Sequence, residues 1–295
     1  MVLTDYLLIV NPVAGHGLKD TRIAHAVKRL SGGARVEIVK TKGRGHAGQL
    51  ADEAVKMKIP HIVAVGGDGT VNEVAGVVAG TPSALGILPM GSGNGLAREL
   101  GLPVHRMDHC LEIIADGYIR DVDYGTVNGR PFFCTCGSGY DSEVAAGFAG
   151  NRVRGLGPYV RLCVQSFFHL PPKRFTAVMD GKEVAYDSVE FNCANIKQFG
   201  FGAEIAPKAD LSDGALNLTV LPRMSLPAAL RCGASLFTGR IDRAPGVRTT
   251  TFREMELTLP ADATFHIDGD AVNVPRQLKI KCVAGGLHVF SPRPA

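Results

Sequence analysis

The chain has 295 residues, of which 45% are hydrophobic and 20% are charged, and its formal net charge is +4. This balance excludes a wholly disordered chain, and so small a net charge does not indicate a nucleic-acid partner. No apolar run reaches the ~18 residues that a membrane-spanning helix needs, and no secretory signal is evident. The length favours two domains, and seven scattered cysteines favour reduced thiols in a cytosolic protein.

Residues 1–121 alternate between strand and helix patterns. The expected strands are Tyr6–Val10, Val36–Val39, Ile62–Val65 and Ala84–Leu88, and the expected helices are Thr21–Leu30, His46–Met57, Thr70–Ala79 and Gly95–Leu100. This alternation predicts an α/β domain around a mainly parallel sheet, which binds ligands at the carboxyl ends of its strands. The polar residues in the loops at those ends are Asn11, Thr41, Asp68 and Ser92.

The segment Gly66–Val74, GGDGTVNEV, is the most informative part of this domain. Its glycines let backbone N–H groups approach an anion closely, and the apolar spacing from Thr70 onward predicts a helix whose N-terminus favours phosphate. Asp68 is expected at the mouth of that site. The alternative is a plain glycine turn with Asp68 capping the helix.

A second glycine pattern, Gly43–Gly48, satisfies GxGxxG but follows the second strand instead of the first. No acidic residue ends the next strand, so we do not expect a dinucleotide site there. The chain also lacks a Walker A lysine loop. A phosphate cradle would therefore consist of backbone amides and helix dipoles.

The second half of the chain changes to short alternating strands. These are Phe175–Met179, Val189–Ala194, Leu216–Leu221, Met255–Leu259 and Leu278–Cys282. They predict a β-rich antiparallel sandwich in which each strand has one solvent-exposed face. We therefore expect two domains, 1–121 and 122–295, and allow the last residues to pack back on the first domain.

Four segments in order support a family resemblance. Gly66–Val74 resembles the nucleotide-binding signature of the diacylglycerol kinase and sphingosine kinase superfamily of lipid kinases, distant relatives of NAD kinases and phosphofructokinases. Asn11–Gly15, Leu88–Arg98 and Asp268–Asp270 resemble the family's first loop, second glycine loop and acidic element. The match runs from about residue 5 to the end of the chain. It implies a Rossmann-like nucleotide domain followed by a β-rich lipid domain.

The resemblance also implies ATP and Mg²⁺ as cofactors. The residues that it assigns to the nucleotide are Asn11, Pro12, Gly15, Thr41, Gly66, Gly67, Asp68, Gly69, Thr70, Asn72, Glu73, Gly91, Ser92, Gly93 and Asn94. His46 starts the helix next to Thr41, where a ligand role and a purely structural role stay open.

Transfer of a phosphoryl group needs a carboxylate that takes the proton of the attacking alcohol. The resemblance assigns this role to Asp270, which replaces the family's Glu and is one methylene shorter; Asp268 could share it. The alternative for the pair is an Asp-Gly hairpin turn. Asp68 and Asp141 resemble carboxylates that orient magnesium or the acceptor hydroxyl, and Asp141 could instead cap a helix.

The loop Asp210–Ala215 resembles the family's structural magnesium loop. Asp213 would supply the carboxylate, while Asp210 and Ala215 would offer carbonyl oxygens, the ligands that a hard cation prefers. An ordinary Asp-Gly turn before the strand Leu216–Leu221 is the alternative.

The stretch Val144–Met179 contains no acidic residue. Its basic residues, Arg152, Arg154, Arg161, Lys173 and Arg174, are interleaved with Phe148, Tyr159, Phe167, Phe168 and Phe175. Such a face suits an anionic bilayer. The alternative is a core of aromatic rings with a solvated arginine rim.

The acceptor is predicted to be a lipid alcohol, either diacylglycerol or a sphingoid type. Gly95 follows Asn94 where diacylglycerol kinases usually carry an acid, which resembles the sphingosine kinase version. We expect a cytoplasmic, peripherally membrane-associated enzyme without a nucleic-acid partner, and leave a homodimer open. The competing functions are a soluble small-molecule kinase related to NAD kinase and a nucleotide-responsive regulator without catalysis.

Overall fold

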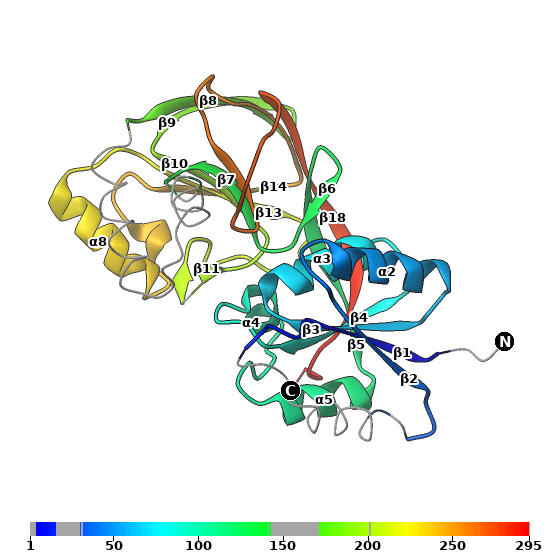
Figure 1. The fold of residues 1–295 in the computed structure, drawn as a ribbon. Helices are drawn as coiled ribbons and strands as arrows, with labels where there is room; N and C mark the ends of the chain where they lie inside the picture. The colour runs from blue at the N-terminus through cyan, green and yellow to red at the C-terminus, as the bar shows by residue number, and fades with distance from the viewer. Residues whose placement is uncertain are drawn as a thin grey trace. The chain divides into compact units, whose positions relative to one another are not determined.

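The computed structural model describes residues 4–15, 30, 32–140, 142, 171–200 and 202–294. It divides into two compact units, which we describe separately (Figure 1). Unit 1 comprises Met1–Asp123 and Ala284–Ala295, and unit 2 comprises Tyr124–Val283. The division falls two residues after the boundary expected from sequence, and the last strand of the chain runs from unit 2 into unit 1.

Unit 1 is an α/β unit around parallel strands. Its elements are β1 (Tyr6–Val10), β2 (Val36–Lys40), α2 (His46–Lys56), β3 (His61–Gly66), α3 (Asp68–Val78), β4 (Ala84–Pro89), α4 (Gly95–Glu99), α5 (Met107–Asp116), the start of β5 (Ile119–Val127) and the end of β18 (Gln277–Phe290). The sheet order is β2-β1-β3-β4-β18. Helices α2 and α3 pack side by side on one face of the sheet, and α5 lies on the other (Figure 1).

The register of the strands brings three loops to one edge. Val10 pairs with Val65, and Val65 pairs with Leu88, so β1, β3 and β4 end at the same level. Burial on both faces explains why β3 and β4 are continuous apolar runs. The loops that follow these strands therefore begin next to one another.

Unit 2 is built from antiparallel strands. Besides parts of β5 and β18 it contains β6 (Arg130–Phe132), β7 (Thr135–Gly139), β8 (Lys173–Met179), β9 (Lys182–Ser188), β10 (Glu190–Ala194), β11 (Gln198–Gly200), β12 (Ala203–Glu204), β13 (Leu216–Leu221), α8 (Leu226–Leu236), the 3₁₀ turn η1 (Ile241–Arg243), β14 (Arg248–Phe252), β15 (Glu254–Thr258), β16 (Phe265–Ile267) and β17 (Asp270–Val272). One sheet has the order β18-β15-β8-β9, a second has the order β14-β13-β10-β7-β16-β17, and β11 and β12 form a separate two-stranded sheet. The first two sheets contribute to one apolar core that includes Phe175, Phe191 and Phe252.

The predicted fold class is confirmed, an α/β domain followed by an antiparallel β sandwich. Strands β1 and β13 have the expected bounds, and β18 is longer than the expected strand Leu278–Cys282. The expected helix Thr21–Leu30 lies, apart from Leu30, outside the described residues. Helices α5 and α8 were not expected, and α8 is discussed below. None of the helices in the described part of the chain has the length and apolar character needed to cross a bilayer.

Candidate active site

Three loops of unit 1 are joined at the carboxyl edge of its sheet. The backbone N–H of Asn11 donates to the Val65 carbonyl over 2.9 Å, and that of Met90 donates to the Gly66 carbonyl over 2.7 Å. A Cβ on Gly91 would lie 2.8 Å from the Cα of Gly67, so only glycine permits this approach of two backbones. The structure thus brings together the three glycine-containing segments that the sequence singled out.

Asp68 is the residue that connects the loops after β3 and β4. Its Oδ2 accepts a hydrogen bond from the N–H of Asn94 over 2.8 Å, and its Oδ1 accepts one from the N–H of Gly95 over 2.7 Å. Hydrogen bonds to an ionised carboxylate are short and strong. The half-buried Asp68 is therefore also a structural residue, where the sequence suggested a carboxylate standing at the mouth of the site.

The second glycine loop is closed by its own asparagine. Asn94 is 3% exposed and has a φ of 53°; its Oδ1 accepts from the N–H of Gly91 over 2.9 Å, and its Nδ2 donates to the Gly91 carbonyl over 2.7 Å. Arg98 adds a brace, because its Nε donates to the Gly93 carbonyl over 2.7 Å. The side chain of Asn94 shapes the loop, where the resemblance implied a contact to the nucleotide. No role for Arg98 was predicted from the sequence, although its place one turn after the loop was a usable signal.

The first loop is fastened to helix α3. Asn11 Nδ2 donates to Thr70 Oγ1 over 3.1 Å, and Asn11 Oδ1 accepts from the N–H of Val13 over 3.2 Å. A Cβ on Gly66 would lie 2.6 Å from the Thr70 side chain, so this glycine makes room for Thr70. Asn11 and Thr70 therefore hold the position of the first loop relative to α3.

Glu73 fills the anion position at the start of α2. Its Oε1 accepts from the N–H of Gly45 over 2.7 Å, and its Oε2 accepts from those of Ala47 over 3.1 Å and Gly48 over 3.4 Å. A helix N-terminus favours a negative charge, and here the protein supplies its own. This gives a physical reason why the GxGxxG pattern is not a dinucleotide site. The side chain of Glu73 caps a helix, where the resemblance implied a nucleotide contact.

The residues next to this helix start make local contacts. The buried Thr41 donates its N–H to the Val10 carbonyl over 2.8 Å, which places it at the carboxyl edge of the sheet. His46 Nδ1 accepts from the N–H of Lys42 over 3.0 Å. This bond within the loop supports the structural alternative for His46.

The N-terminus of α3 lies at the junction of the three loops. The helix begins at Asp68, and its N-cap residue, Gly67, supplies no capping side chain. Gly69 and Ser92 are exposed at this junction. Uncapped amides at a helix N-terminus form a ready anion site, so the arrangement suits a phosphate group.

In unit 2, Asp268 and Gly269 form a two-residue hairpin turn between β16 and β17. Both residues have positive φ, 50° and 80°, and Ile267 pairs with Asp270 across the turn. This is the geometry of a type I′ turn, for which Asp-Gly is a preferred sequence. The local backbone is therefore the Asp-Gly hairpin turn that the sequence offered as an alternative to a catalytic pair.

The carboxylate of Asp268 also connects the hairpin to another segment of unit 2. It accepts hydrogen bonds from the N–H groups of Phe133 over 3.0 Å, Cys134 over 2.7 Å and Thr135 over 3.1 Å. Burial raises the pKa of Asp268 to about 6, although these three donors and nearby His266 favour the ionised form. Asp268 thus fixes the hairpin to the segment that leads into β7.

Asp270 is the first residue of β17 and is exposed. Of the two acids in this hairpin, it is the more exposed one, which suits a group that exchanges protons. Asp141 lies outside the described residues. Its predicted role therefore stays a prediction from sequence.

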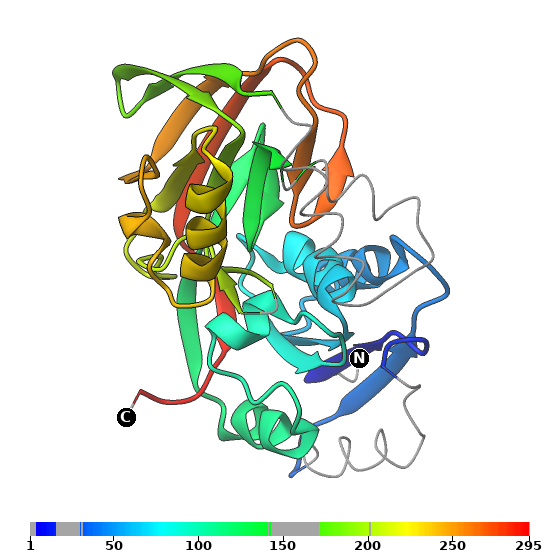
Figure 2. The same ribbon diagram turned by 90° about the vertical axis from the view of Figure 1, so that its left-hand side faces the viewer.

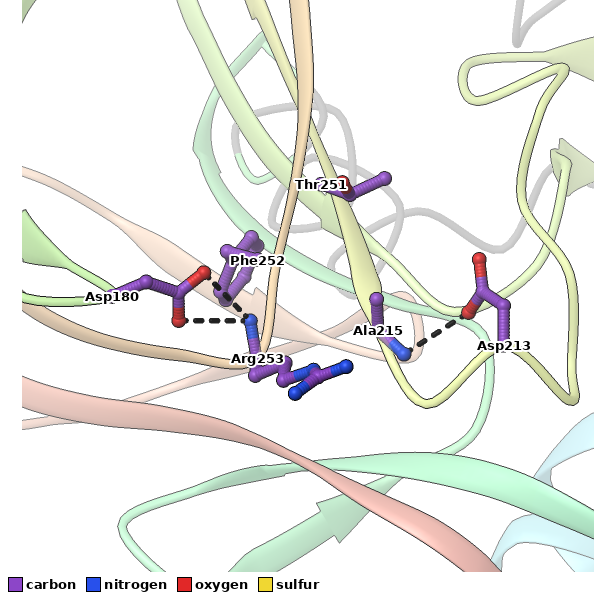
Figure 3. Close-up of a pocket in the computed structure, with 6 residues that line it drawn as sticks. All are labelled: Asp180, Asp213, Ala215, Thr251, Phe252 and Arg253. Carbon is purple, nitrogen blue, oxygen red and sulfur yellow. Dashed lines mark hydrogen bonds between the residues drawn. The ribbon is translucent and has the colours of Figure 1, made fainter.

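The predicted metal loop is compact and lines a cavity. Asp210 Oδ1 accepts from the N–H of Ser212 over 2.9 Å, and Asp213 Oδ1 accepts from that of Ala215 over 3.0 Å. The cavity, of about 530 Å³, is lined by Asp180, Asp213, Ala215, Thr251, Phe252 and Arg253 (Figure 3).

This loop offers few protein ligands to a cation. Asp213 retains a second carboxylate oxygen, but the cationic Arg253 lines the same cavity. The described residues contain no group of three or more His, Cys, Asp and Glu that could hold a metal. A cation here would have Asp213, backbone carbonyls and water as its ligands.

Most of the predicted membrane face, Val144–Met179, lies outside the described residues, including Arg152, Arg154 and Arg161. The described end of this stretch belongs to the fold. Phe175 is 1% exposed, and Arg174 pairs with Asp187 over 3.2 Å. At this end the alternative of an aromatic core with a charged rim is correct.

Known proteins resemble the chain over its whole length. Residues 5–127 match the diacylglycerol kinase catalytic domain, and residues 134–291 match the YegS C-terminal NAD kinase beta sandwich-like domain. A protein named diacylglycerol kinase from Mycobacterium tuberculosis is 33% identical, over 97% of this chain and 94% of its own length. A protein from Yersinia enterocolitica named "Probable lipid kinase YegS-like" is 30% identical, over 90% of each chain.

A solved structure shows the same fold. The crystal structure of a diacylglycerol kinase from Bacillus anthracis superposes with a TM-score of 0.77 at 19% identity, covering 99% of this chain and 98% of that one. The two domain matches and the identity to the relatives confirm the predicted superfamily and the prediction of an enzyme. The chain belongs to the bacterial lipid kinase family that carries the diacylglycerol kinase catalytic domain and the YegS-type C-terminal domain.

Proposed function

We propose that the protein transfers the γ-phosphoryl group of ATP to the hydroxyl of a lipid alcohol. The observation that carries this proposal is the junction of the three loops in unit 1 beside the uncapped N-terminus of α3. Transfer of a phosphoryl group depends on positioning and charge stabilisation more than on covalent chemistry. Preorganised backbone amides supply both without a lysine loop.

The chain's own groups would hold the phosphates at this junction. The N–H groups in the first turn of α3 and those of Ser92 and Gly93 are the proposed donors, because the N–H of Gly91 already donates to Asn94. Asp68 keeps these two segments together through its bonds to Asn94 and Gly95. Asp68 therefore acts on the nucleotide site at least partly by positioning its loops.

We assign the proton acceptor to Asp270. Its exposed carboxylate would take the proton from the acceptor hydroxyl, while the buried bonds of Asp268 keep the hairpin in place. Asp141 stays a proposed partner of Asp68 in orienting the reacting groups. The assignment of Asp270 predicts that a change to Asn, which cannot accept a proton, removes turnover.

Magnesium, when bound, neutralises phosphate charge during transfer. The residues that fit a separate structural ion are Asp213, through its carboxylate, and Asp210 and Ala215, through their carbonyls. Added Mg²⁺ should raise the melting temperature of the wild type but not of Asp213→Asn. An equal rise in both proteins would remove this loop from the proposal.

Diacylglycerol is the first proposed acceptor, because relatives of the chain are named diacylglycerol kinases. A sphingoid base is the second, because Gly95 stands where diacylglycerol kinases usually carry an acid. The surface of an anionic membrane is the proposed place of reaction. A peripheral enzyme would meet either lipid there.

A transfer assay with radiolabelled ATP tests the proposal. The acceptors are diacylglycerol, a sphingoid base and ceramide in mixed micelles, with NAD as the soluble competitor. We expect labelled lipid from the wild type and a loss of roughly a hundredfold or more in kcat for Asp270→Asn. Asp270→Glu, which restores the family's residue, is the matched control and should stay active.

Two results would contradict the proposal. Labelling of NAD without labelling of any lipid would favour the soluble kinase, and nucleotide binding without any transfer would favour the regulator. Full activity of Asp270→Asn together with inactive Asp268→Asn would mean that Asp268, and not Asp270, is the general base. A fold check on both variants by thermal unfolding separates these outcomes from misfolding.

A further inference from the structure

Helix α8 carries its large apolar side chains on the outside of unit 2. Leu226 is 49% exposed and Leu230 is 67% exposed, and Phe237, the C-cap residue, is 63% exposed. Their spacing of four and seven residues places them on one face of the helix. Figure 2 shows α8 in yellow at the surface of this unit.

The opposite face of α8 attaches the helix to the unit. Cys232 is 4% exposed, and Leu236 packs against a buried cluster that includes Ile205 and Ala209. Apart from Leu236, the residues turned toward the protein are small, whereas three large apolar ones face outward. This reverses the usual pattern of a surface helix, in which the outer face is polar. The exposed stripe is therefore not needed to hold the helix in place.

The charged residues of the segment that carries α8 are all basic, although the Glu204 carboxylate lies beside Gly239 just after the helix. Residues 214–241 contain no Asp or Glu, and their basic residues, Arg223, Arg231 and Arg240, are exposed. The next acid, Asp242, pairs with Lys208 over 2.9 Å. An apolar stripe flanked by exposed arginines matches an anionic bilayer, in which acyl chains lie beneath phosphate groups. A second copy of the same positive face would be repelled.

We propose that α8 docks unit 2 on an anionic lipid bilayer. Leu226, Leu230 and Phe237 enter the boundary between headgroups and acyl chains, and Arg231 with its neighbours contacts lipid phosphates. The inference rests on the proposed function, because a lipid acceptor resides in a bilayer. It adds a surface distinct from the stretch Val144–Met179.

A fluorescence experiment tests the contact directly, because the chain contains no tryptophan. Leu230→Trp introduces a single probe on the stripe, and Val178→Trp, at a position 40% exposed on β8, is the matched control. Vesicles of phosphatidylcholine with and without phosphatidylglycerol are added without ATP or acceptor.

We expect a blue shift for Leu230→Trp on anionic vesicles and quenching by brominated lipid. We expect neither for Val178→Trp. An unshifted Leu230→Trp emission, while the protein sediments with vesicles, would overturn the proposal.

Vesicle partition measures how much the stripe contributes. The combined change Leu226→Gln, Leu230→Gln and Phe237→Gln should lower partition roughly tenfold or more, since the apolar area that enters the bilayer is lost. Met57→Gln, at a position 53% exposed in unit 1, should leave it unchanged. Arg231→Gln should weaken binding and reduce its salt dependence. If the triple variant unfolds, Leu230→Gln alone gives the answer.

Activity separates this inference from the proposed function. The triple variant should lose activity on vesicle lipid and keep it on a short-chain, water-soluble diacylglycerol. A wild type without any kinase activity would contradict the proposed function, while the binding experiments would still be decisive for α8. Unchanged partition of the triple variant, or a loss of oligomers in it, would overturn docking on lipid.

Discussion

Two of the chain's five Asp-Gly sequences, one from each unit, use a carboxylate to accept backbone amide hydrogen bonds, but they connect different kinds of segment. Asp68 opens helix α3 and accepts amide hydrogen bonds from the loop after β4. Asp268 occupies a hairpin turn and accepts them from residues 133–135. The first set joins α3 to the loop after β4, and the second fixes a hairpin to the segment that leads into β7. The comparison teaches that the amide partners of an Asp-Gly pair, and not the pair itself, define what its carboxylate does.

The largest expected effect comes from removing the carboxylate of Asp268 in unit 2. Asp268→Ala leaves three backbone donors without their acceptor and should lower the free energy of unfolding by about 3 kcal/mol. Urea denaturation measures the change. Asp270→Ala, exposed on the same hairpin, is the control and should change stability far less; equal losses would show that the amide bonds of Asp268 are not what stabilises this turn.

The corresponding change in unit 1 should be somewhat smaller. Asp68→Ala removes the acceptor of two amides and should cost about 2 kcal/mol in the free energy of unfolding, in addition to most of the phosphoryl transfer. Asp68→Asn keeps one acceptor oxygen and should retain more stability than Asp68→Ala. Unchanged stability with lost activity would mean that Asp68 acts on the ligand alone.

Alanine substitutions at two glycines, one in each unit, separate the effect of steric crowding from that of backbone strain. Gly91→Ala places a Cβ 2.8 Å from the Cα of Gly67 and should cost about 1.5 kcal/mol while weakening nucleotide binding. Gly269→Ala meets no atom within 4 Å but has a φ of 80°, so strain alone should cost about 1 kcal/mol. Thermal unfolding and nucleotide titration measure the stability and the nucleotide binding of each variant. Weakened nucleotide binding in Gly269→Ala would contradict the assignment of the nucleotide site to the loops of unit 1 alone.

The smallest expected effect is a dependence on pH in unit 2. The pKa of folded Asp268 is raised to about 6, above its ordinary value of about 3.9. The folded state therefore binds the Asp268 proton more tightly than the unfolded state does. The free energy of unfolding should fall as this proton is lost, by about 1 kcal/mol between pH 5 and 7. Asp268→Asn should lack that decline in denaturation series over this range. Parallel pH profiles of the two proteins would contradict the assignment.

Much of the fold could be predicted from local patterns. Apolar and alternating runs predicted β1 to β4 of unit 1 and β8, β10, β13, β15 and β18, but not the other strands, such as β7 and β16. The glycine segments lie at the predicted edge of the first sheet. The reach of β18 and the existence of α8 could not be predicted in this way. An exposed apolar face looks the same in sequence as a buried one, and only the packing shows which side of α8 is covered.

The sequence by itself determined the family, the α/β and β-sandwich layout and the segments that form the candidate site. These features depend on patterns within a few residues, which short-range sterics and burial dictate. The tertiary structure alone decided what the carboxylates bind. The contacts of Asp68, Glu73 and Asp268 join segments between 25 and 135 residues apart. Sheet order and register bring such partners together, and no local pattern encodes them.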